Sequence, residues 1–569
     1  MSVKTVTTFT TAIPSTVELL EVKLAETLNF YLNYLERIPG GLIIQRYIRS
    51  SYRDDPIRSV FEFALFLFAV HYFLSSKKKE NKSELVKFSK KEIDDLVEEW
   101  EPAPLVDEVT ELEHWRLAEN HVKGKNGAHI ELVQHPEYGK VVNLSSLDFL
   151  NLNGNSDLDA AARLTIASSG VGACGPPNFY GTQDVHVRLE EDLARYLGSE
   201  QAILYGQDFV TAGSVIPAFL KRGDLAVVDS GVSLAIQKAL IVSRCDIEWF
   251  DHNDMEHLDQ ILSELKPMLS KQKLRRRFIV TEAMFAYSGD IANLPEIVEL
   301  KNKYKYRLFV DETLSIGTLG KSGRGITEHF GISRDEISIT IGSLANAFAS
   351  SGGFCVGVRP MVHHQRINSI AYVFSAALPP YSAKVVSETI KLITESENSD
   401  GQSAIISALQ EKVKYTYEKL TKKFTHSKYL TVKSCLDSPI IHLGFTDAFR
   451  EKLDLPPMYG NSTFLTKGRP ERKLNKFSHH YNVECYIMQK IINTLLVQQH
   501  TLINRTRIVY EQENLPVESP RLLIHINSGV SHEELNAVIS ALPTVVNEVC
   551  SRLKGPADLF TLENELMTL

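Results

Sequence analysis

Acidic and small polar residues end several short apolar runs in the middle of the chain. The runs at 224–229, 277–281 and 306–311 end in Asp229, Thr281 and Asp311. A short apolar run bounded by polar residues is typical of a strand buried on both faces of a parallel sheet. We therefore expect functional groups at the edge where these strands end.

A glycine-rich segment at 341–354 follows Asp311 and holds Ser343 and Asn346. Together with residues 310–317, it resembles the paired motifs of the α-oxoamine synthases, enzymes that use pyridoxal phosphate (PLP). In that family the first segment usually reads V-D-E-A-H-S-x-G and the second G-T-F-x-K-x-F-G-x-x-G-G. The resemblance implies the α/β fold of type I PLP-dependent aminotransferases. That fold has a large domain with a mostly parallel sheet and a smaller C-terminal α+β domain.

The aligned positions lack residues that the cofactor chemistry needs. A lysine amine must hold the PLP aldehyde, and a side chain stacks on the ring. The family's lysine falls on Asn346, and an amide cannot form an aldimine. Two family histidines fall on Leu314 and Gly231, and a family serine falls on Ala286. The resemblance therefore predicts no catalytic residue in this chain.

Two parts of the expected site are retained. Asp311 occupies the position that pairs with the pyridinium nitrogen, and Ser343 occupies that of a phosphate-contacting hydroxyl. The family's substrate-carboxylate arginine falls on Leu523, but Arg521 lies two residues away and can face the same side of a strand. Lys321 is the nearest lysine downstream of Asp311 and is a poor substitute. We expect no PLP bound by this chain alone.

A second glycine-rich stretch, at 170–186, matches a further motif of the family. Active sites of the family lie at a dimer interface, and loops of one subunit approach the cofactor of the other. The resemblance makes Gly172, Cys174, Tyr180 and Tyr205 candidates for interface or trans-site residues. The alternatives are a loop whose glycines only permit tight turns and, for Cys174, a small packed side chain without chemistry.

The motifs cover about residues 90–550 and most resemble lysine-lacking subunits among the membrane-bound members of the family. This implies a heterodimer with a lysine-bearing catalytic subunit, which holds the PLP. The pair would condense L-serine with palmitoyl-CoA to 3-ketodihydrosphingosine, CoA and CO₂. A small activating subunit and Orm-type regulatory membrane proteins are implied as further partners.

Two alternatives to the heterodimer remain open. The chain could be an active relative of the aminotransferases with relocated chemistry. It could instead be a membrane-anchored pseudoenzyme scaffold with no role in the condensation.

An apolar run at 57–75 precedes the motifs and is followed by three lysines at 77–79. A helix of about 18 residues spans roughly 27 Å, close to the thickness of a bilayer core. The run predicts one transmembrane helix; the alternative is a buried helix, which Glu62 and His71 favour. The family resemblance implies the endoplasmic reticulum membrane, with the enzyme-like body in the cytosol. The flanking charges alone leave the orientation open.

The expected organisation follows from these segments. It comprises an amphipathic juxtamembrane segment (1–56), the transmembrane helix (57–75), a linker with a short helix (76–104), the large domain (105–395) and the small domain (396–569) with a polar insertion at about 455–480.

Composition excludes several classes of function. The 569 residues carry a net charge of −8, so nothing global indicates nucleic-acid binding. The six cysteines form no CxxC pair, which argues against a zinc site. Sparse cysteines in a long chain are typical of a protein in a reducing compartment.

Overall fold

The computed structural model describes residue 30 and residues 39–80, 88–101, 120–271, 275–459, 479–508 and 515–566. These residues belong to two compact units, Met1–Glu108 and Val109–Leu569. Most of the predicted amphipathic juxtamembrane segment (1–56) and of the polar insertion at about 455–480 lies outside the described residues.

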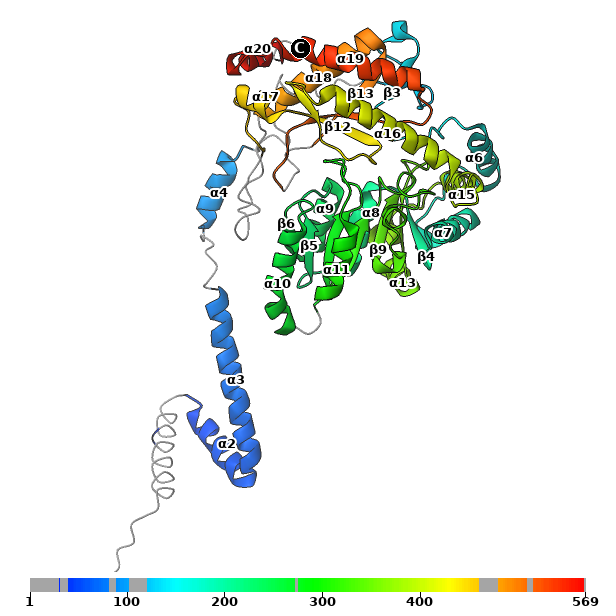
Figure 1. Cartoon of the computed structure of the whole chain (residues 1–569). Coiled ribbons are helices and arrows are strands. Elements are labelled where there is room, and N and C mark those ends of the chain that lie inside the picture. The colour runs from blue at the N-terminus through cyan, green and yellow to red at the C-terminus, as the bar shows by residue number, and fades with distance from the viewer. Residues whose placement is uncertain are drawn as a thin grey trace, which may run out of the picture. The chain divides into compact units, whose positions relative to one another are not determined.

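The described part of the first unit is helical, and Figure 1 draws its helices in blue. Its helices are α2 (Gly41–Asp54), α3 (Pro56–Glu80) and α4 (Lys90–Glu99). The acidic helix α4 begins with a capping box, in which Ser89 and Glu92 each bond to the other's backbone N–H.

The predicted transmembrane run lies in α3. Its described side chains from Val60 to Leu74 are almost all exposed and mostly apolar, and an ion pair joins Arg58 to Glu62 near its start. Among the residues that the structure describes, no helix is both long and apolar enough to cross a membrane. The predicted span is thus not found as a transmembrane helix.

The second unit contains a buried seven-stranded sheet in the order β4-β10-β9-β8-β7-β5-β6. Strands β6, β5, β7, β8 and β9 run parallel, and β10 is antiparallel to both of its neighbours. The predicted runs at 224–229, 277–281 and 306–311 are confirmed as strands. The sheet consists of β4 (Gln201–Tyr205), β5 (Leu225–Asp229), β6 (Asp246–Phe250), β7 (Arg277–Glu282), β8 (Arg307–Asp311), β9 (Ile339–Ser343) and β10 (Gly353–Gly357).

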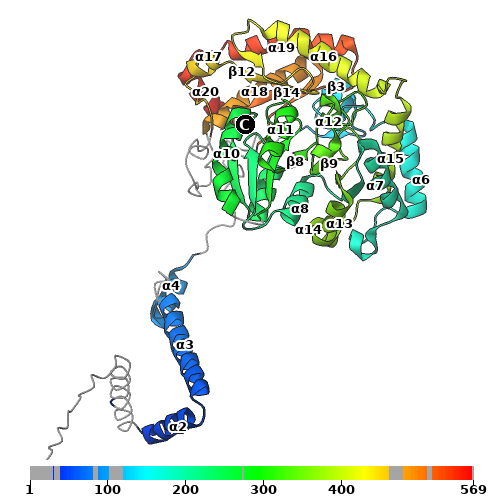
Figure 2. The same cartoon turned by 60° about the horizontal axis from the view of Figure 1, so that its bottom comes forward.

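Helices cover this sheet, as Figures 1 and 2 show, and bury the apolar side chains of its strands. They are α6 (Ser156–Ser169), α7 (Asp184–Leu197), α8 (Phe209–Phe219), α9 (Leu234–Ser243), α10 (Met255–Lys271), α11 (Leu294–Tyr304), α12 (Ile326–Phe330), α13 (Arg359–Asn368), α14 (Ile370–Phe374) and α15 (Pro380–Glu395). Short turns are η1 (Pro136–Tyr138), η2 (Pro177–Gly181) and η3 (Arg334–Glu336).

A second seven-stranded sheet has the order β1-β2-β3-β13-β14-β12-β11. Its strands are β1 (Val122–Lys123), β2 (His129–Leu132), β3 (Val141–Leu144), β11 (Leu430–Val432), β12 (Ile440–Phe445), β13 (Thr501–Arg505) and β14 (Arg521–His525). Its helices are α16 (Ala404–Phe424), α17 (Asp447–Lys452), α18 (His479–Gln499), α19 (His532–Cys550) and α20 (Pro556–Leu566).

The second sheet is assembled from both ends of the body. Strand β3 pairs with β13 in parallel, so residues 122–144 complete the sheet to which the C-terminal region contributes its strands. The predicted domain boundary near residue 395 follows sequence order, which does not reveal that these early strands belong to the C-terminal sheet. One apolar cluster joins the second sheet to the end of the first, where the candidate site lies.

Candidate functional site

A cavity of about 220 Å³ lies at the edge where β7 and β8 end. Its described lining includes three carboxylates, Asp208, Glu282 and Asp311, and no lysine, arginine or histidine. Glu282 and Asp311 are register partners on neighbouring parallel strands. Leu314 and Ala286 form part of the apolar wall. Of the three strand-end residues singled out in the sequence, only Asp311 lines this cavity, and all of the ionisable groups in its described lining are acidic.

The buried carboxylates resist ionisation together. Burial raises the pKa of Glu282 to about 8, and the neighbouring Asp311 adds to the rise. Burial also raises the pKa of Asp311 to about 6, although its oxygen accepts the Thr313 N–H at 2.9 Å. The carboxylates of Glu312 and Asp208 contribute to this second rise. An anionic ligand in the cavity would be repelled by the ionised form of these carboxylates.

Asn346 does not line the cavity of these carboxylates. Its side chain is buried, and its Nδ2 donates a hydrogen bond to the Thr313 carbonyl oxygen at 3.0 Å. It also lines a separate cavity of about 550 Å³, together with Asn143, Ser146 and Asp148. The amide at the lysine position therefore holds one loop to another.

Ser343 ends β9 and is also engaged within the protein. Its hydroxyl donates to Oδ2 of Asp208 at 3.2 Å and accepts the Ala345 N–H at 3.0 Å. Asp208 precedes α8 and accepts the Phe209 N–H at 2.8 Å. The hydroxyl that the resemblance assigns to a phosphate is thus bonded to a carboxylate.

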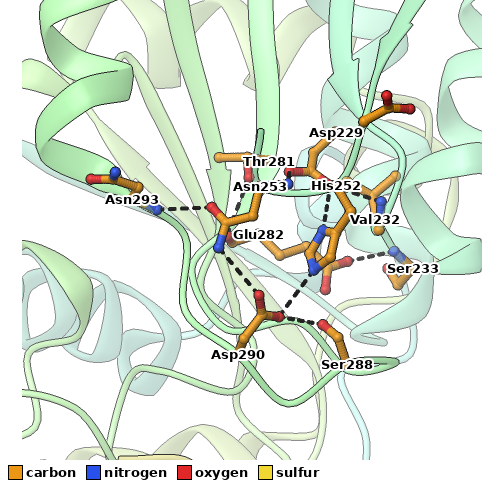
Figure 3. A network of polar contacts seen from close by, with 12 residues as sticks. Asp229, Val232, Ser233, His252, Asn253, Thr281, Glu282, Ser288, Asp290 and Asn293 are labelled. Carbon is orange, nitrogen blue, oxygen red and sulfur yellow. Dashed lines mark hydrogen bonds and ion pairs between the residues drawn. The ribbon is translucent and has the colours of Figure 1, made fainter. Parts of the chain in front are cut away.

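The place of the ring-stacking histidine is taken by another imidazole. A Cβ built on Gly231 would overlap the ring of His252, which follows β6. Figure 3 shows this ring between Asp229 and Asp290, with Ser288 and Asn253 also bonded to Asp290. Its Nδ1 lies 2.8 Å from Asp229 and its Nε2 lies 3.1 Å from Asp290.

His252 is held as a cation by this arrangement. Burial alone would lower its pKa, but the hydrogen bonds and charges of Asp229 and Asp290 outweigh burial and raise the pKa to about 10. The network ties together the segments that follow β5, β6 and β7. It leaves no space for a side chain at position 231.

The other positions at which a residue of the family is replaced or shifted also make structural contacts. Ala286 donates its backbone N–H to Glu282 at 3.3 Å. Leu523 is partly buried against the apolar cluster. Arg521 points to the loop after β7, where it donates to the Ser288 carbonyl oxygen at 3.0 Å, and it pairs with Glu518. Neither Leu523 nor Arg521 lines the carboxylate-lined cavity.

The glycine-rich stretch after α6 lies on the surface. Tyr180 is fully exposed, and both Tyr180 and Cys174 adopt left-handed backbone conformations, with φ of 66° and 56°. Non-glycine residues rarely adopt this conformation, so surrounding structure must hold it. A Cβ on Gly181 would overlap the carbonyl oxygen of Gly175, so position 181 must be glycine for these two backbone segments to approach each other. Gly172 is also exposed.

Tyr205 differs from the other interface candidates. It is buried in β4, and its hydroxyl donates to Oε1 of Gln365 at 2.7 Å. Its side chain thus joins the sheet to α13 inside the body, and its role as an interface or trans-site residue stays a prediction.

Sequence reasoning missed Asp208 and His252. Each has a usable signal, because Asp208 stands just before the apolar helix α8 and His252 stands just after a strand. The role of each residue depends on its contacts with residues far away in the chain, and the local sequence does not predict those contacts. In the described parts of the chain, no group of three His, Cys, Asp or Glu side chains could hold a metal ion.

The residues present do not fit PLP. Asn346 supplies no amine, the stacking position is occupied by His252, and the cavity places carboxylates where a phosphate would have to bind. Asp311 alone retains the group expected for the pyridinium nitrogen. We derive no chemical step through PLP at this site.

Comparisons with known proteins agree with this fold. The model of the aminotransferase class I and II family matches residues 139–542. The chain is 41% identical over 537 residues to Serine palmitoyltransferase 1 of Saccharomyces cerevisiae, covering 92% of this chain and 94% of the yeast protein. It is 34% identical over 454 residues to Serine palmitoyltransferase 1 of Dictyostelium discoideum, covering 80% and 87%.

Two solved structures share the fold at low sequence identity. Serine palmitoyltransferase of Sphingomonas wittichii superimposes with a TM-score of 0.59 at 18% identity, covering 76% of this chain and 92% of that one. For 8-amino-7-oxononanoate synthase of Francisella tularensis the TM-score is 0.51 at 17% identity, covering 72% and 98%. The chain thus belongs to the aminotransferase class I and II family, among the serine palmitoyltransferase 1 proteins.

Proposed function

We propose that this chain is the non-catalytic subunit of a serine palmitoyltransferase. It pairs with a lysine-bearing catalytic subunit that holds PLP, and the pair condenses L-serine with palmitoyl-CoA to 3-ketodihydrosphingosine, CoA and CO₂. The single observation that carries the proposal is Asn346, whose amide is bonded to the Thr313 carbonyl at the position of the family's lysine. A chain with this site needs a partner to supply the nucleophile.

An exposed apolar surface supports the pairing. The loop around η2 contacts α14, and the Ala377 N–H donates to the Gly175 carbonyl at 2.9 Å. Large apolar side chains are exposed along these segments: Val171, Phe179, Tyr180, Ile367, Ile370 and Phe374. We name these six residues the pairing surface. Apolar groups gathered in this way are typical of protein–protein contacts.

Within the pair, this chain contributes contacts to the partner subunit and supplies no reacting group. Tyr180, exposed and conformationally constrained, is the side chain best placed to reach into a partner. The PLP of the partner would supply the electron sink for the condensation. The groups that this chain holds around its own cavity stabilise the fold of its half.

We place the chain in the endoplasmic reticulum membrane, with the body on the cytosolic side. Support comes from α3, whose exposed side chains include Phe61, Phe63, Phe66, Phe68 and Phe73. An apolar surface of this kind is costly to leave in water and is favourable in lipid. A small activating subunit and Orm-type membrane proteins are the further partners that the family resemblance supports.

Affinity purification from detergent-solubilised native membranes tests the proposal. The tagged chain is assayed for serine-dependent release of CoA from palmitoyl-CoA, and copurifying subunits are identified. We expect activity together with a lysine-bearing subunit. Activity from this polypeptide alone would show that Asn346 has been misinterpreted. Partners without activity would favour the scaffold alternative.

A further inference from the structure

Asp208 makes two contacts at the rim of the carboxylate-lined cavity. One oxygen, Oδ1, accepts the Phe209 N–H at 2.8 Å and caps the 11-residue helix α8. The other oxygen, Oδ2, accepts the hydroxyl of Ser343 at 3.2 Å. A single carboxylate therefore joins the start of α8 to the end of β9.

These donors come from separate elements and converge on one negative group. The first turn of a helix presents unpaired N–H groups and the positive end of the helix dipole, which favour an anion. Ser343 is the hydroxyl that the family resemblance assigns to the cofactor phosphate. Asp208 thus occupies the position where that resemblance places a phosphate.

The surrounding cavity agrees with this assignment. Glu282 and Asp311 also line it, and no described lysine, arginine or histidine does. A phosphate dianion in the place of the Asp208 carboxylate would lie beside the other two carboxylates and would lack a compensating cation in the described lining. Asp208 adds only one charge, and its two hydrogen bonds offset the cost of placing that charge beside the others.

We propose that Asp208 is an internal substitute for the cofactor phosphate. Its carboxylate satisfies the donors at α8 and Ser343, which holds the β4–α8 loop against β9 without a ligand. The same carboxylate rejects phosphorylated ligands from the cavity. This inference goes beyond the proposed function, because it concerns how this chain's own fold is stabilised, whatever partner it binds.

The test uses Asp208→Gly in the full-length chain in detergent, with inorganic phosphate as the probe. Removing the carboxylate exposes the donors, so we expect a lower thermal midpoint that phosphate raises by about 2–4 °C at constant ionic strength. The unmodified chain should show no such shift. Asp208→Asn, which keeps the shape and removes the charge, should respond less than Asp208→Gly.

Asn155→Gly is the matched control. Asn155 caps α6, a 14-residue helix, by accepting the N–H groups of Asp157 and Leu158. Its loss removes a helix cap without touching the cavity. This variant should also lower the midpoint, but phosphate should not restore it.

An equal phosphate shift in the unmodified chain would overturn the proposal, as would a folded Asp208→Gly chain with no response. If Asp208→Gly does not fold, Asp208→Ser retains a cap and lacks the charge. Equilibrium dialysis with radiolabelled phosphate should then show at least a tenfold gain in affinity over the unmodified chain, and equal affinity would refute the proposal. Copurification of a lysine-bearing subunit is a separate measurement, so failure of the proposed function remains distinguishable.

Discussion

Asn346, at the position of the family's lysine, makes a structural hydrogen bond. Its amide donates to the Thr313 carbonyl oxygen, and Asn346 does not line the cavity beside Asp311. The hydrogen bond joins the two loops that carry the family's most diagnostic motifs. At the residue scale, Asn346 therefore connects two loops through a buried hydrogen bond.

Replacing Asn346 with alanine should therefore destabilise the body. The Thr313 carbonyl would lose its buried donor, at a cost of about 1–2 kcal/mol in the free energy of unfolding. Urea unfolding followed by fluorescence measures this cost. Asn302→Ala, which removes an exposed bond to Glu336, should cost less than about 0.5 kcal/mol. Equal losses of unfolding free energy in the two variants would contradict a structural role for the Asn346 hydrogen bond.

The His252 network predicts a loss of stability at alkaline pH. Its folded-state pKa of about 10 lies above the unfolded value of 6.5, so the native state holds the proton more tightly. The stabilisation is complete below about pH 6.5 and disappears as pH rises towards 10, with a total on the order of a few kcal/mol. Denaturation midpoints of the chain and of His252→Gln between pH 6 and 10 check this. The difference between the two should shrink as pH rises, and a constant difference would refute it.

At the scale of elements, function is concentrated where short segments meet and not in the long helices. The turn η2 and the five-residue helix α14 contact each other and expose the pairing surface. Helix α13 directly precedes α14, and its Arg366 forms an ion pair with Glu190 of α7. Because the large sheet and α7 fix these segments, the surface is presented on a rigid support. Its aromatic residue Phe374 is 73% exposed.

Charged substitutions on this surface should separate the subunits. Ile370→Asp combined with Phe374→Asp would place two carboxylates in an apolar contact, where each unpaired charge is strongly unfavourable. We expect at least a tenfold loss of the copurifying subunit and of serine-dependent CoA release. Met268→Asp, on an exposed site of α10, is the matched control and should retain both. An unchanged yield of partner would exclude this surface from pairing.

At the scale of the whole molecule, the chain divides into a small helical unit and a large body with its own cores. The body carries both sheets, both large apolar clusters and every residue of the candidate site. The division separates the proposed membrane contact from the proposed pairing. Anchoring and assembly should therefore be separable by experiment.

A chain that begins at Val109 should fold and still pair. Because the apolar clusters lie within the body, its thermal midpoint should agree with that of the full chain within about 2 °C. Sedimentation with membranes should fall, while copurification of the lysine-bearing subunit persists. A truncated chain that pairs but supports no condensation would show that the N-terminal unit does more than anchor.

The sequence by itself determined the fold class and the asparagine at the position of the family's cofactor lysine. Strand runs ending at Asp229 and Asp311 and the asparagine at position 346 are local features, readable because buried strands and a missing amine leave direct marks in the order of residues. Only the tertiary structure decided that Asp208 meets Ser343, that His252 fills the space at Gly231 and that Tyr205 is buried. These outcomes depend on contacts between residues far apart in the chain. The same reason explains why strands from residues 122–144 complete the C-terminal sheet, which no local pattern predicts.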